Sequence, residues 1–426
     1  MTARATIVAL ASGRPPSAIA IVRVSGPGAF EASRVLVGRL PSSRRAALRA
    51  VRRPDGVLLD RALVLAFAGP ASATGEDIVE LHLHGGQAVI AAVIEAMTDI
   101  PGVRLAEPGE FTRRAFDNGR LDLTQVEGLA DLLAATTEAQ RAQAVTTSEG
   151  ALAKAAAAWR SVALAALIET EAQIDFADED DVAATADLHG IEQVTNEMAA
   201  ALAGATNAER VREGLTVVLL GPPNSGKSSL LNALAGRDAA IVSAIAGTTR
   251  DPVTIDLDFC GVPATLIDTA GLRASDDPVE AEGIARALFR AEAADLLLRV
   301  GGARGAETGW PVHTMIDLTG EMPGERGGTS YVSALTGAGI GVLRQRLTEW
   351  ATTMIPNREA VLVSHARQRR ELNDATVQLR RAISETDDVL RAEALRLGLR
   401  ALGRLTGSVD VEEVLGGIFA RFCIGK

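Results

Sequence analysis

The chain has 426 residues, too long for one hydrophobic core, so two or three domains are expected. Its 54 acidic against 43 basic residues give a formal net charge of −11, which argues against binding nucleic acid through bulk positive charge. With only two cysteines, Cys260 and Cys423, a disulfide framework and a cysteine-based zinc cluster are excluded. The N-terminus lacks a signal-peptide layout, and Lys154 and Arg160 interrupt the Ala-rich segment 151–168, so we expect a soluble cytoplasmic protein.

Only three basic residues are lysines: Lys154, Lys227 and Lys426. Lys227 follows glycines in a loop where a compact ammonium suits a phosphate group. The arginines cluster at 39–53, at 113–120 and at 367–404. Any contact with RNA would therefore be local, and the alternative is that these clusters are solvated helix faces.

Residues 1–118 mix short apolar segments with glycine and proline turns, a pattern typical of an α+β domain. The predicted elements are strands at 19–24, 61–67 and 78–83 and a helix at 87–97.

From 119 to 212 glycines become rare and apolar residues recur at helical spacing, which predicts the first part of a helical domain. Strands and helices alternate from 213 to 354, as in a parallel, doubly wound α/β domain. Helical spacing returns at 355–426. We therefore predict a multidomain protein in which the α/β domain is inserted into the α-helical domain.

A nucleotide-binding loop is predicted directly after the first strand of the α/β domain. The apolar segment 216–220 precedes Gly221-Pro-Pro-Asn-Ser-Gly-Lys-Ser228, and a helical pattern follows. Glycines let backbone amides face phosphate oxygens, Lys227 reaches the β and γ phosphates, and Ser228 supplies a Mg²⁺ ligand.

Two further segments indicate a nucleotide-dependent switch. Asp268-Thr-Ala-Gly271 follows a strand at 264–267 and offers Asp268 to the Mg²⁺ shell. Gly247-Thr-Thr-Arg-Asp251 offers Thr249 as a ligand that joins when a γ-phosphate is present. Leu272 stands where many regulatory GTPases carry a water-orienting glutamine, and no arginine finger is identifiable.

Base selection is expected from an Asn-Lys-x-Asp element, but the sequence here reads Thr314-Met-Ile-Asp317. Asp317 can accept hydrogen bonds from the guanine N1 and N2 groups, and Met315 can imitate the lysine stem. Thr314 is expected to be a poor substitute for the asparagine that ties the loops together. Ser333 and Ala334 fit the last guanine-facing loop, so GTP is the predicted ligand, bound weakly or with reduced selectivity.

The predicted GTP contacts form four groups along the chain. They are Asn224, Ser225, Gly226, Lys227, Ser228 and Ser229; Ser243, Ala244, Ile245, Ala246, Gly247, Thr248 and Thr249; Asp268, Thr269, Ala270 and Gly271; and Asp317, Ser333 and Ala334.

Together these motifs resemble the bacterial tRNA uridine-modification GTPases of the MnmE (TrmE) family. The similar segments include Ile245-Ala-Gly-Thr-Thr-Arg-Asp251, Asp268-Thr-Ala-Gly-Leu-Arg273, Thr74-Gly-Glu-Asp77, the stretch from Ala106 to Gln125 and the Phe422-Cys-Ile-Gly-Lys426 tail. The resemblance covers nearly the whole chain and implies a folate-binding N-terminal domain and a Ras-like G domain.

The resemblance also implies roles for individual residues. In place of an arginine finger, a K⁺ ion would be bound by Asn224, Ser243, Ile245 and Thr248, and Glu280 would orient the attacking water. A 5-formyl- or 5,10-methylene-tetrahydrofolate would contact Arg23, Glu80, Arg120 and Lys426. Cys423 would take part in modification; the alternative is a small residue buried in the tail. His82 and His84 are expected to be strand and turn residues rather than metal ligands.

The implied protein is a homodimeric, K⁺-activated GTPase that works with a flavin-dependent partner of the MnmG (GidA) family. Together they would place an aminomethyl-type group on C5 of the wobble uridine of certain tRNAs. Two alternatives remain at this stage. One is an Era-like GTPase switch in ribosome assembly; the other is a degenerate nucleotide-binding scaffold, suggested by Thr314-Met315 and by the short segment 299–311.

Overall fold

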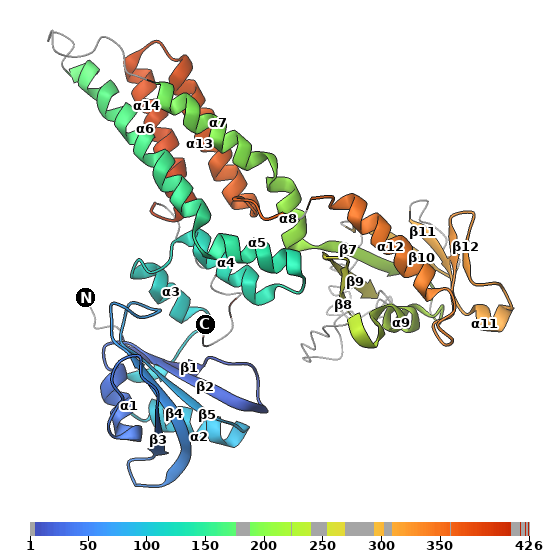
Figure 1. Cartoon of the computed structure of the whole chain (residues 1–426), viewed down its shortest axis with the longest axis horizontal. Coiled ribbons are helices and arrows are strands. Elements are labelled where there is room, and N and C mark those ends of the chain that lie inside the picture. Colours follow the sequence, from blue (N-terminus) through green and yellow to red (C-terminus); the bar gives the residue numbers. More distant parts are fainter. Residues whose placement is uncertain are drawn as a thin grey trace, which may run out of the picture. The chain divides into compact units, whose positions relative to one another are not determined.

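The computed structural model describes residues 5–175, 188–222, 224–239, 254–268, 294–301, 309–357 and 359–409, together with 418, 422 and 425 (Figure 1). The chain forms two compact units. The first comprises residues 1–130, 148–191 and 377–426, and the second comprises residues 131–147 and 192–376.

The first unit contains a six-stranded sheet in the order β3-β4-β5-β2-β1-β6. Its pairs are antiparallel except for the parallel pair of β1 and β6. The strands expected at 19–24, 61–67 and 78–83 are confirmed as parts of β2, β4 and β5. The strands are β1 (Thr6–Leu10), β2 (Ser17–Ser25), β3 (Ala47–Arg52), β4 (Leu58–Phe67), β5 (Ile78–Gly85) and β6 (Val103–Leu105).

The two faces of this sheet are covered differently. Alternate residues such as Val22 and Val24 point to one face and pack against α1 (Ala29–Val37) and α2 (Gln87–Thr98). The helix expected at 87–97 is therefore confirmed as α2. On the other face, Phe111 of α3 (Glu110–Asp117) packs against Ile7 and Ala9 of β1.

The helical regions expected after residue 119 and from residue 355 are confirmed. They contain α4 (Leu123–Ala134), α5 (Glu138–Ser148), α6 (Ala151–Asp175), α7 (His189–Ala203), α8 (Ala205–Glu213), α13 (Ala366–Ser384) and α14 (Asp388–Thr406). Within the first unit, α6 and α14 lie side by side (Figure 1). The small buried residues Ala156, Ala163 and Ala166 recur at helical spacing along α6 and allow close packing.

The helical stretch Glu138–Asp175 is long and apolar enough to cross a membrane by length and composition alone. Gly150, with a φ of 77°, separates α5 from α6, and α6 carries Lys154 and Arg160. Because α6 packs along α14, we interpret it as a core helix of the bundle.

The second unit contains a seven-stranded sheet in the order β12-β13-β11-β10-β7-β9-β8. The five strands from β13 to β9 are parallel to their neighbours, and β12 and β8 are antiparallel edges. A doubly wound sheet was expected, and this is confirmed. Its strands are β7 (Leu215–Leu220), β8 (Thr254–Phe259), β9 (Val262–Asp268), β10 (Leu296–Val300), β11 (Trp310–His313), β12 (Gly324–Arg326) and β13 (Thr329–Tyr331).

One face of this sheet packs against α9 (Lys227–Ala239) and α12 (Ile340–Met354) in a single apolar core. On that face, Trp310 of β11 meets Trp350 of α12 edge to face, with 6.3 Å between ring centroids. The parallel strands β10 and β11 are joined by residues 301–309 alone, which is shorter than the roughly dozen residues that such a crossover commonly uses.

The two ends of the α/β domain are held next to each other. Arg212, just before β7, donates from Nε to the carbonyl oxygen of Ser364 at 3.1 Å. Gln143 of α5 binds both backbone groups of Val361, beyond α12, at 2.8 and 2.9 Å. Insertion requires neighbouring ends, so these contacts explain how the helical domain accommodates the α/β domain.

The cap of α14 provides a test of the packing in the first unit. Gly407 ends α14 with a φ of 85°, and a Cβ there would lie 2.7 Å from Leu123 Cβ. We expect Gly407→Ala to lower the free energy of unfolding by about 1–3 kcal/mol more than Gly102→Ala does. Gly102 has the same φ with open space around it, so it isolates the steric cost. Equal shifts of the two variants in thermal unfolding would contradict this packing.

Candidate functional site

The glycine-rich loop lies at the carboxyl end of β7, between Leu220 and the start of α9 at Lys227. A Cβ on Gly221 would lie 2.4 Å from the carbonyl oxygen of Val300, the last residue of β10. A Cβ on Gly301 would lie 2.7 Å from Ser225 Cβ. Glycine is therefore required at both positions, because the loop packs directly on the end of β10. Ligands of open α/β sheets bind at this carboxyl edge.

Lys227 is buried, with 4% of its surface exposed, and its ammonium is held inside the loop. Nζ donates to the carbonyl oxygens of Gly221 at 2.9 Å and Pro222 at 2.8 Å. An ammonium has three donors, so one is left to point at an anion bound in the loop.

Ser228 and Asp268 meet beside this loop. Asp268 ends β9, pairs with Leu219 of β7 and is 2% exposed. Its Oδ2 accepts a hydrogen bond from Ser228 Oγ. A hydroxyl and a carboxylate are the oxygen ligands that Mg²⁺ prefers, so the pair fits a magnesium ion next to the phosphates.

The predicted base-recognition loop joins β11 to the short helix α11 (Ile316–Thr319). Thr314 was expected to hold the loops together poorly, but its Oγ1 donates to the carbonyl oxygen of Ser225 at 2.6 Å. Asp317 Oδ1 accepts from Ser333 Oγ, so the two segments expected to read the base are brought together. Ala334 follows Ser333 and is half-buried.

Other predicted nucleotide residues divide into two groups. Asn224, Gly226 and Ser229 lie in the loop or on the first turn of α9, and Asn224 has a φ of 60°. The remaining predicted residues fall outside the described part of the chain. They are Ser243, Ala244, Ile245, Ala246, Gly247, Thr248, Thr249, Thr269, Ala270, Gly271 and Glu280, as well as Cys423 and Lys426 of the tail.

Arg23 and Glu80, two of the residues expected to bind a folate, lie on the face of the first sheet against which Phe111 packs. Arg23 of β2 and Glu80 of β5 are register partners, and Arg23 Nη2 lies 2.8 Å from Glu80 Oε1. The Arg23 guanidinium also lies 5.8 Å from the Phe111 ring centre. Arg120 is exposed, and its Cγ would lie 3.3 Å from a Cβ on Gly75. Arg23 and Glu80 thus satisfy each other, which the sequence did not indicate.

His82 and His84 both lie in β5, as expected of strand residues. His84 Nδ1 lies 2.7 Å from Asp60 Oδ1 of β4, and His82 Nε2 lies 3.5 Å from Glu80 Oε2.

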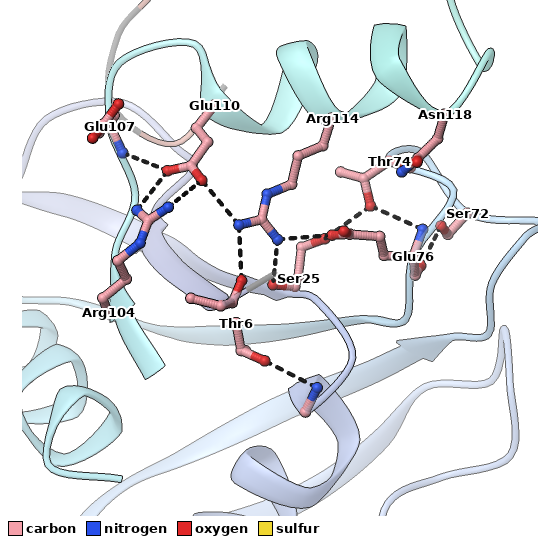
Figure 2. A network of polar contacts seen from close by, with 12 residues as sticks. Thr6, Ser25, Ser72, Thr74, Glu76, Arg104, Glu107, Glu110, Arg114 and Asn118 are labelled. Carbon is pink, nitrogen blue, oxygen red and sulfur yellow. Dashed lines mark hydrogen bonds and ion pairs between the residues drawn. The ribbon is translucent and has the colours of Figure 1, made fainter. Parts of the chain in front are cut away.

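Sequence reasoning missed a polar network centred on Arg114. This side chain is only 4% exposed and points from α3 into the loop that follows β4 (Figure 2). It donates to Glu76 Oε2 at 2.9 Å, to Glu110 Oε1 at 2.9 Å and to the Ala5 carbonyl oxygen at 2.8 Å. A buried charge requires such partners. The spacing of Glu110 and Arg114, four residues apart on one helix, was the available signal.

The network also fixes the loop that contains Thr74 and Glu76. Ser25 Oγ lies 2.8 Å from Thr74 Oγ1 and donates to Glu76 Oε2 at 3.0 Å. Asn118, just after α3, donates to the Thr74 carbonyl oxygen at 2.7 Å. The Thr74-Gly-Glu-Asp77 motif and the helical motif after Ala106 are therefore two halves of one structural unit (Figure 2).

Glu110 is the most strongly perturbed carboxyl of this network. Burial by itself would raise the pKa of Glu110, but hydrogen bonds from Arg104, from the Glu107 amide and from Arg114 outweigh it and lower this pKa to about 2. Arg104 contributes contacts of 2.6 and 2.8 Å.

Two described residues of the C-terminal segment, Phe422 and Gly425, pack within the first unit. Phe422 is buried in a cluster with Leu123 and Val126 of α4 and with Phe116 of α3. A Cβ on Gly425 would lie 1.9 Å from the Leu10 carbonyl oxygen at the end of β1, so the tail touches the first sheet.

The doubly wound sheet with Lys227, Ser228 and Asp268 at its carboxyl edge defines a P-loop nucleotide-binding protein. Residues 6–120 match the family model described as "GTP-binding protein TrmE N-terminus", and residues 123–423 match the one described as "MnmE helical domain". The chain belongs to the MnmE (TrmE) family.

Relatives that match over nearly their whole length have names of this family. A "tRNA modification GTPase MnmE" of Bradyrhizobium sp. (strain ORS 278) is 48% identical over 438 residues, covering 99% of each chain. One of Rhodopseudomonas palustris (strain ATCC BAA-98 / CGA009) is 50% identical over 438 residues, also covering 99% of each chain.

Solved structures are similar over part of the chain only. The G domain of the T. maritima FeoB iron transporter is 24% identical and covers 32% of this chain and 98% of its own, with a TM-score of 0.24. Aquifex aeolicus Era bound to GDP and AlF4⁻ is 21% identical and covers 42% of this chain and 69% of its own, with a TM-score of 0.26.

The low pKa of Glu110 gives a pH-dependent prediction. Because this pKa lies below the ordinary glutamate value of 4.5, the stabilisation by Glu110 is complete above pH 4.5 and is lost as the pH falls towards 2. We expect Glu110→Gln to be less stable at neutral pH and to flatten the acid decline between these values, by up to about 1.4 kcal/mol per pH unit.

The measurement is urea unfolding across this pH range. Glu95→Gln is the matched control, because Glu95 forms an exposed pair with Arg53 in the same unit and surface pairs contribute little. A Glu110→Gln profile parallel to that of the unsubstituted protein would contradict the assigned role.

Proposed function

We propose that the chain is a GTPase that takes part in tRNA modification. The observation that carries this proposal is the meeting of Lys227 and the Ser228–Asp268 pair at the carboxyl edge of the second sheet. The names of relatives about half identical over the full length support it.

In this proposal each described residue of the site has a defined task. Lys227 binds the β and γ phosphates with the donor that its loop contacts leave available, and the amides at the start of α9 add positive potential. Ser228 and Asp268 would hold Mg²⁺, which neutralises phosphate charge when bound. Asp317, steadied by Ser333, accepts hydrogen bonds from guanine.

Apart from Asn224, the residues predicted to orient water and neutralise charge lie outside the described part of the chain. We assign the orientation of the attacking water to Glu280. Asn224, Ser243, Ile245 and Thr248 would bind K⁺, whose fixed charge supports the transition state in place of an arginine. Asn224 is exposed in the phosphate loop beside Ser225, so its side-chain oxygen is accessible to a cation at the phosphates.

The modification itself is proposed at C5 of the wobble uridine of certain tRNAs, by a cytoplasmic homodimer with a flavin-dependent partner. Arg23, Glu80, Arg120 and Lys426 would hold the one-carbon tetrahydrofolate. Glu80 fits this task, since its carboxylate can accept hydrogen bonds from the pterin donors while Arg23, 2.8 Å away, orients it. Cys423 would act in the tail, whose Gly425 lies next to Leu10 of the first sheet.

An Era-like switch in ribosome assembly is the weaker candidate, because the first sheet and helical bundle match the MnmE and TrmE family models. A degenerate scaffold is also less favoured, because the phosphate and base loops are held in contact with each other.

GTP turnover in K⁺ compared with Na⁺ tests the hydrolytic mechanism. We expect turnover in K⁺ to be at least about tenfold faster, because a monovalent ion of the right size stabilises the developing charge. Glu280→Ala should lower turnover in K⁺ about a hundredfold while GTP still binds. Glu349→Ala, an exposed glutamate on α12, is the control. A rate indifferent to the cation would refute K⁺ activation, and no turnover at all would favour the scaffold.

Asp317→Asn tests the choice of base. Replacing the carboxylate removes an acceptor for guanine N1–H and N2–H, so GTP affinity should fall about ten- to a hundredfold. XTP affinity should rise, because the new amide can donate to the xanthine O2. The control is Asp258→Asn, since Asp258 caps the exposed turn between β8 and β9. Unchanged GTP affinity in titration calorimetry would show that another loop reads the base.

A further inference from the structure

We propose that Thr314 is the positioning residue that fastens the base-recognition loop to the phosphate-binding loop, and that Met315 is the wall on which the purine ring packs. This inference rests on the proposed GTP binding. It replaces the expectation of weak, poorly selective binding with a base pocket formed by an alternative pair of residues.

The hydrogen bond of Thr314 provides the fastening. Its Oγ1 donates to the Ser225 carbonyl oxygen at 2.6 Å, and this carbonyl belongs to the peptide that leads into Gly226. Threonine is β-branched, so its side chain has few rotamers and the hydroxyl is held toward its acceptor. One short, stiff side chain therefore bridges two loops that are 89 residues apart.

The contact between the loops is steric as well as polar. A Cβ on Gly226 would lie 3.3 Å from Met315 Cε and 3.4 Å from Thr314 Oγ1. The loop that carries Thr314 and Met315 thus packs against Gly226, the residue directly before Lys227. This packing sets the distance between the proposed base pocket and the phosphate site.

Met315 has the backbone and exposure of a ligand-facing residue. Its φ of 59° is left-handed, a conformation that costs a non-glycine residue free energy and is common at functional sites. Its side chain is 37% exposed although it lies next to the buried Ile316. A flexible thioether packs well on an aromatic ring, so Met315 can cover guanine without the charge of a lysine.

Hydrogen bonds also fix the position of Asp317 on the other side of the proposed pocket. Asp317 Oδ1 accepts from Ser333 Oγ, and Ser333 Oγ in turn accepts from the Thr336 amide at 3.2 Å. The Val332 amide donates to the His313 carbonyl oxygen at 2.8 Å. Because both ends of the loop are fixed before the base arrives, little ordering cost remains on binding.

Substitutions of Thr314 and Met315 should change nucleotide binding in different ways. Loss of the Thr314 hydroxyl frees the loop and disturbs the two-point contact of Asp317 with N1–H and N2–H. It should therefore reduce the preference for GTP over ITP, which lacks the 2-amino group. Loss of the Met315 side chain removes packing that both purines share, so it should weaken both nucleotides equally.

The experiment measures the dissociation constants of GTP and ITP for the full chain by titration calorimetry. We expect Thr314→Val to weaken GTP binding about tenfold and to lower the preference for GTP over ITP about threefold. Thr314→Ser keeps the hydroxyl, so it should retain the affinity and the preference of the unsubstituted protein. Met315→Ala should weaken both nucleotides about fivefold with the preference unchanged.

Thr319→Val is the matched control, because the Thr319 hydroxyl on the same short helix binds only the exposed Glu321 among the contacts described there. Absence of GTP binding by the unsubstituted protein would refute the proposed function itself. If the unsubstituted protein binds GTP and Thr314→Val keeps both its affinity and its preference, the positioning role of Thr314 is wrong. If Met315→Ala binds both nucleotides as before, Met315 is not the wall.

Discussion

The candidate site depends on the close packing of one loop, residues 221–226, against the carboxyl edge of the second sheet. Gly221 meets the Val300 carbonyl oxygen from one side, and Gly301 leaves room for Ser225 from another. Only a chain without a Cβ at these positions can bring the loop this close to the end of β10. The residues predicted to bind the phosphates, the magnesium ion and the base therefore all lie beside this loop.

Charged and polar side chains maintain that packing from within. Lys227 binds the carbonyls of its own loop, Ser228 binds Asp268 of β9, and Thr314 binds Ser225 from β11. The second and third of these contacts connect the loop and the first turn of α9 to the ends of β9 and β11. In the first unit, the Arg114 network likewise holds separate segments together: one buried guanidinium binds α3, β2 and the loop before β5. Buried polar groups that find all their partners specify one arrangement of the chain.

The sequence predicted most of the fold because its strongest signals are local. Apolar segments, glycines and helical spacing located β2, β4, β5, β7 and β9 and the helical regions, since these patterns depend on neighbours in the chain. The phosphate loop was predictable because its chemistry demands particular residues at fixed spacing. The substitute role of Thr314 was not predictable, because it depends on which carbonyl lies 2.6 Å away in space. The pairing of Arg23 with Glu80 likewise depends on strand register, and the burial of Arg114 on tertiary packing.

In the second unit, helix α5 contacts both chain segments that lead into and out of the α/β domain, and one of these segments is short. Gln140 of α5 donates to the Arg212 carbonyl oxygen at 3.0 Å, and β7 begins three residues later and leads straight into the phosphate loop. Gln143 of the same helix holds Val361, which follows α12. Helix α5 therefore contacts both segments that connect the α/β domain to the rest of the chain. His365, 2.7 Å from Asp131, fixes the start of α13 at the same junction. Because a β-strand cannot shorten or lengthen appreciably, β7 sets the separation between the phosphate loop at its carboxyl end and the segment that α5 contacts before its first residue.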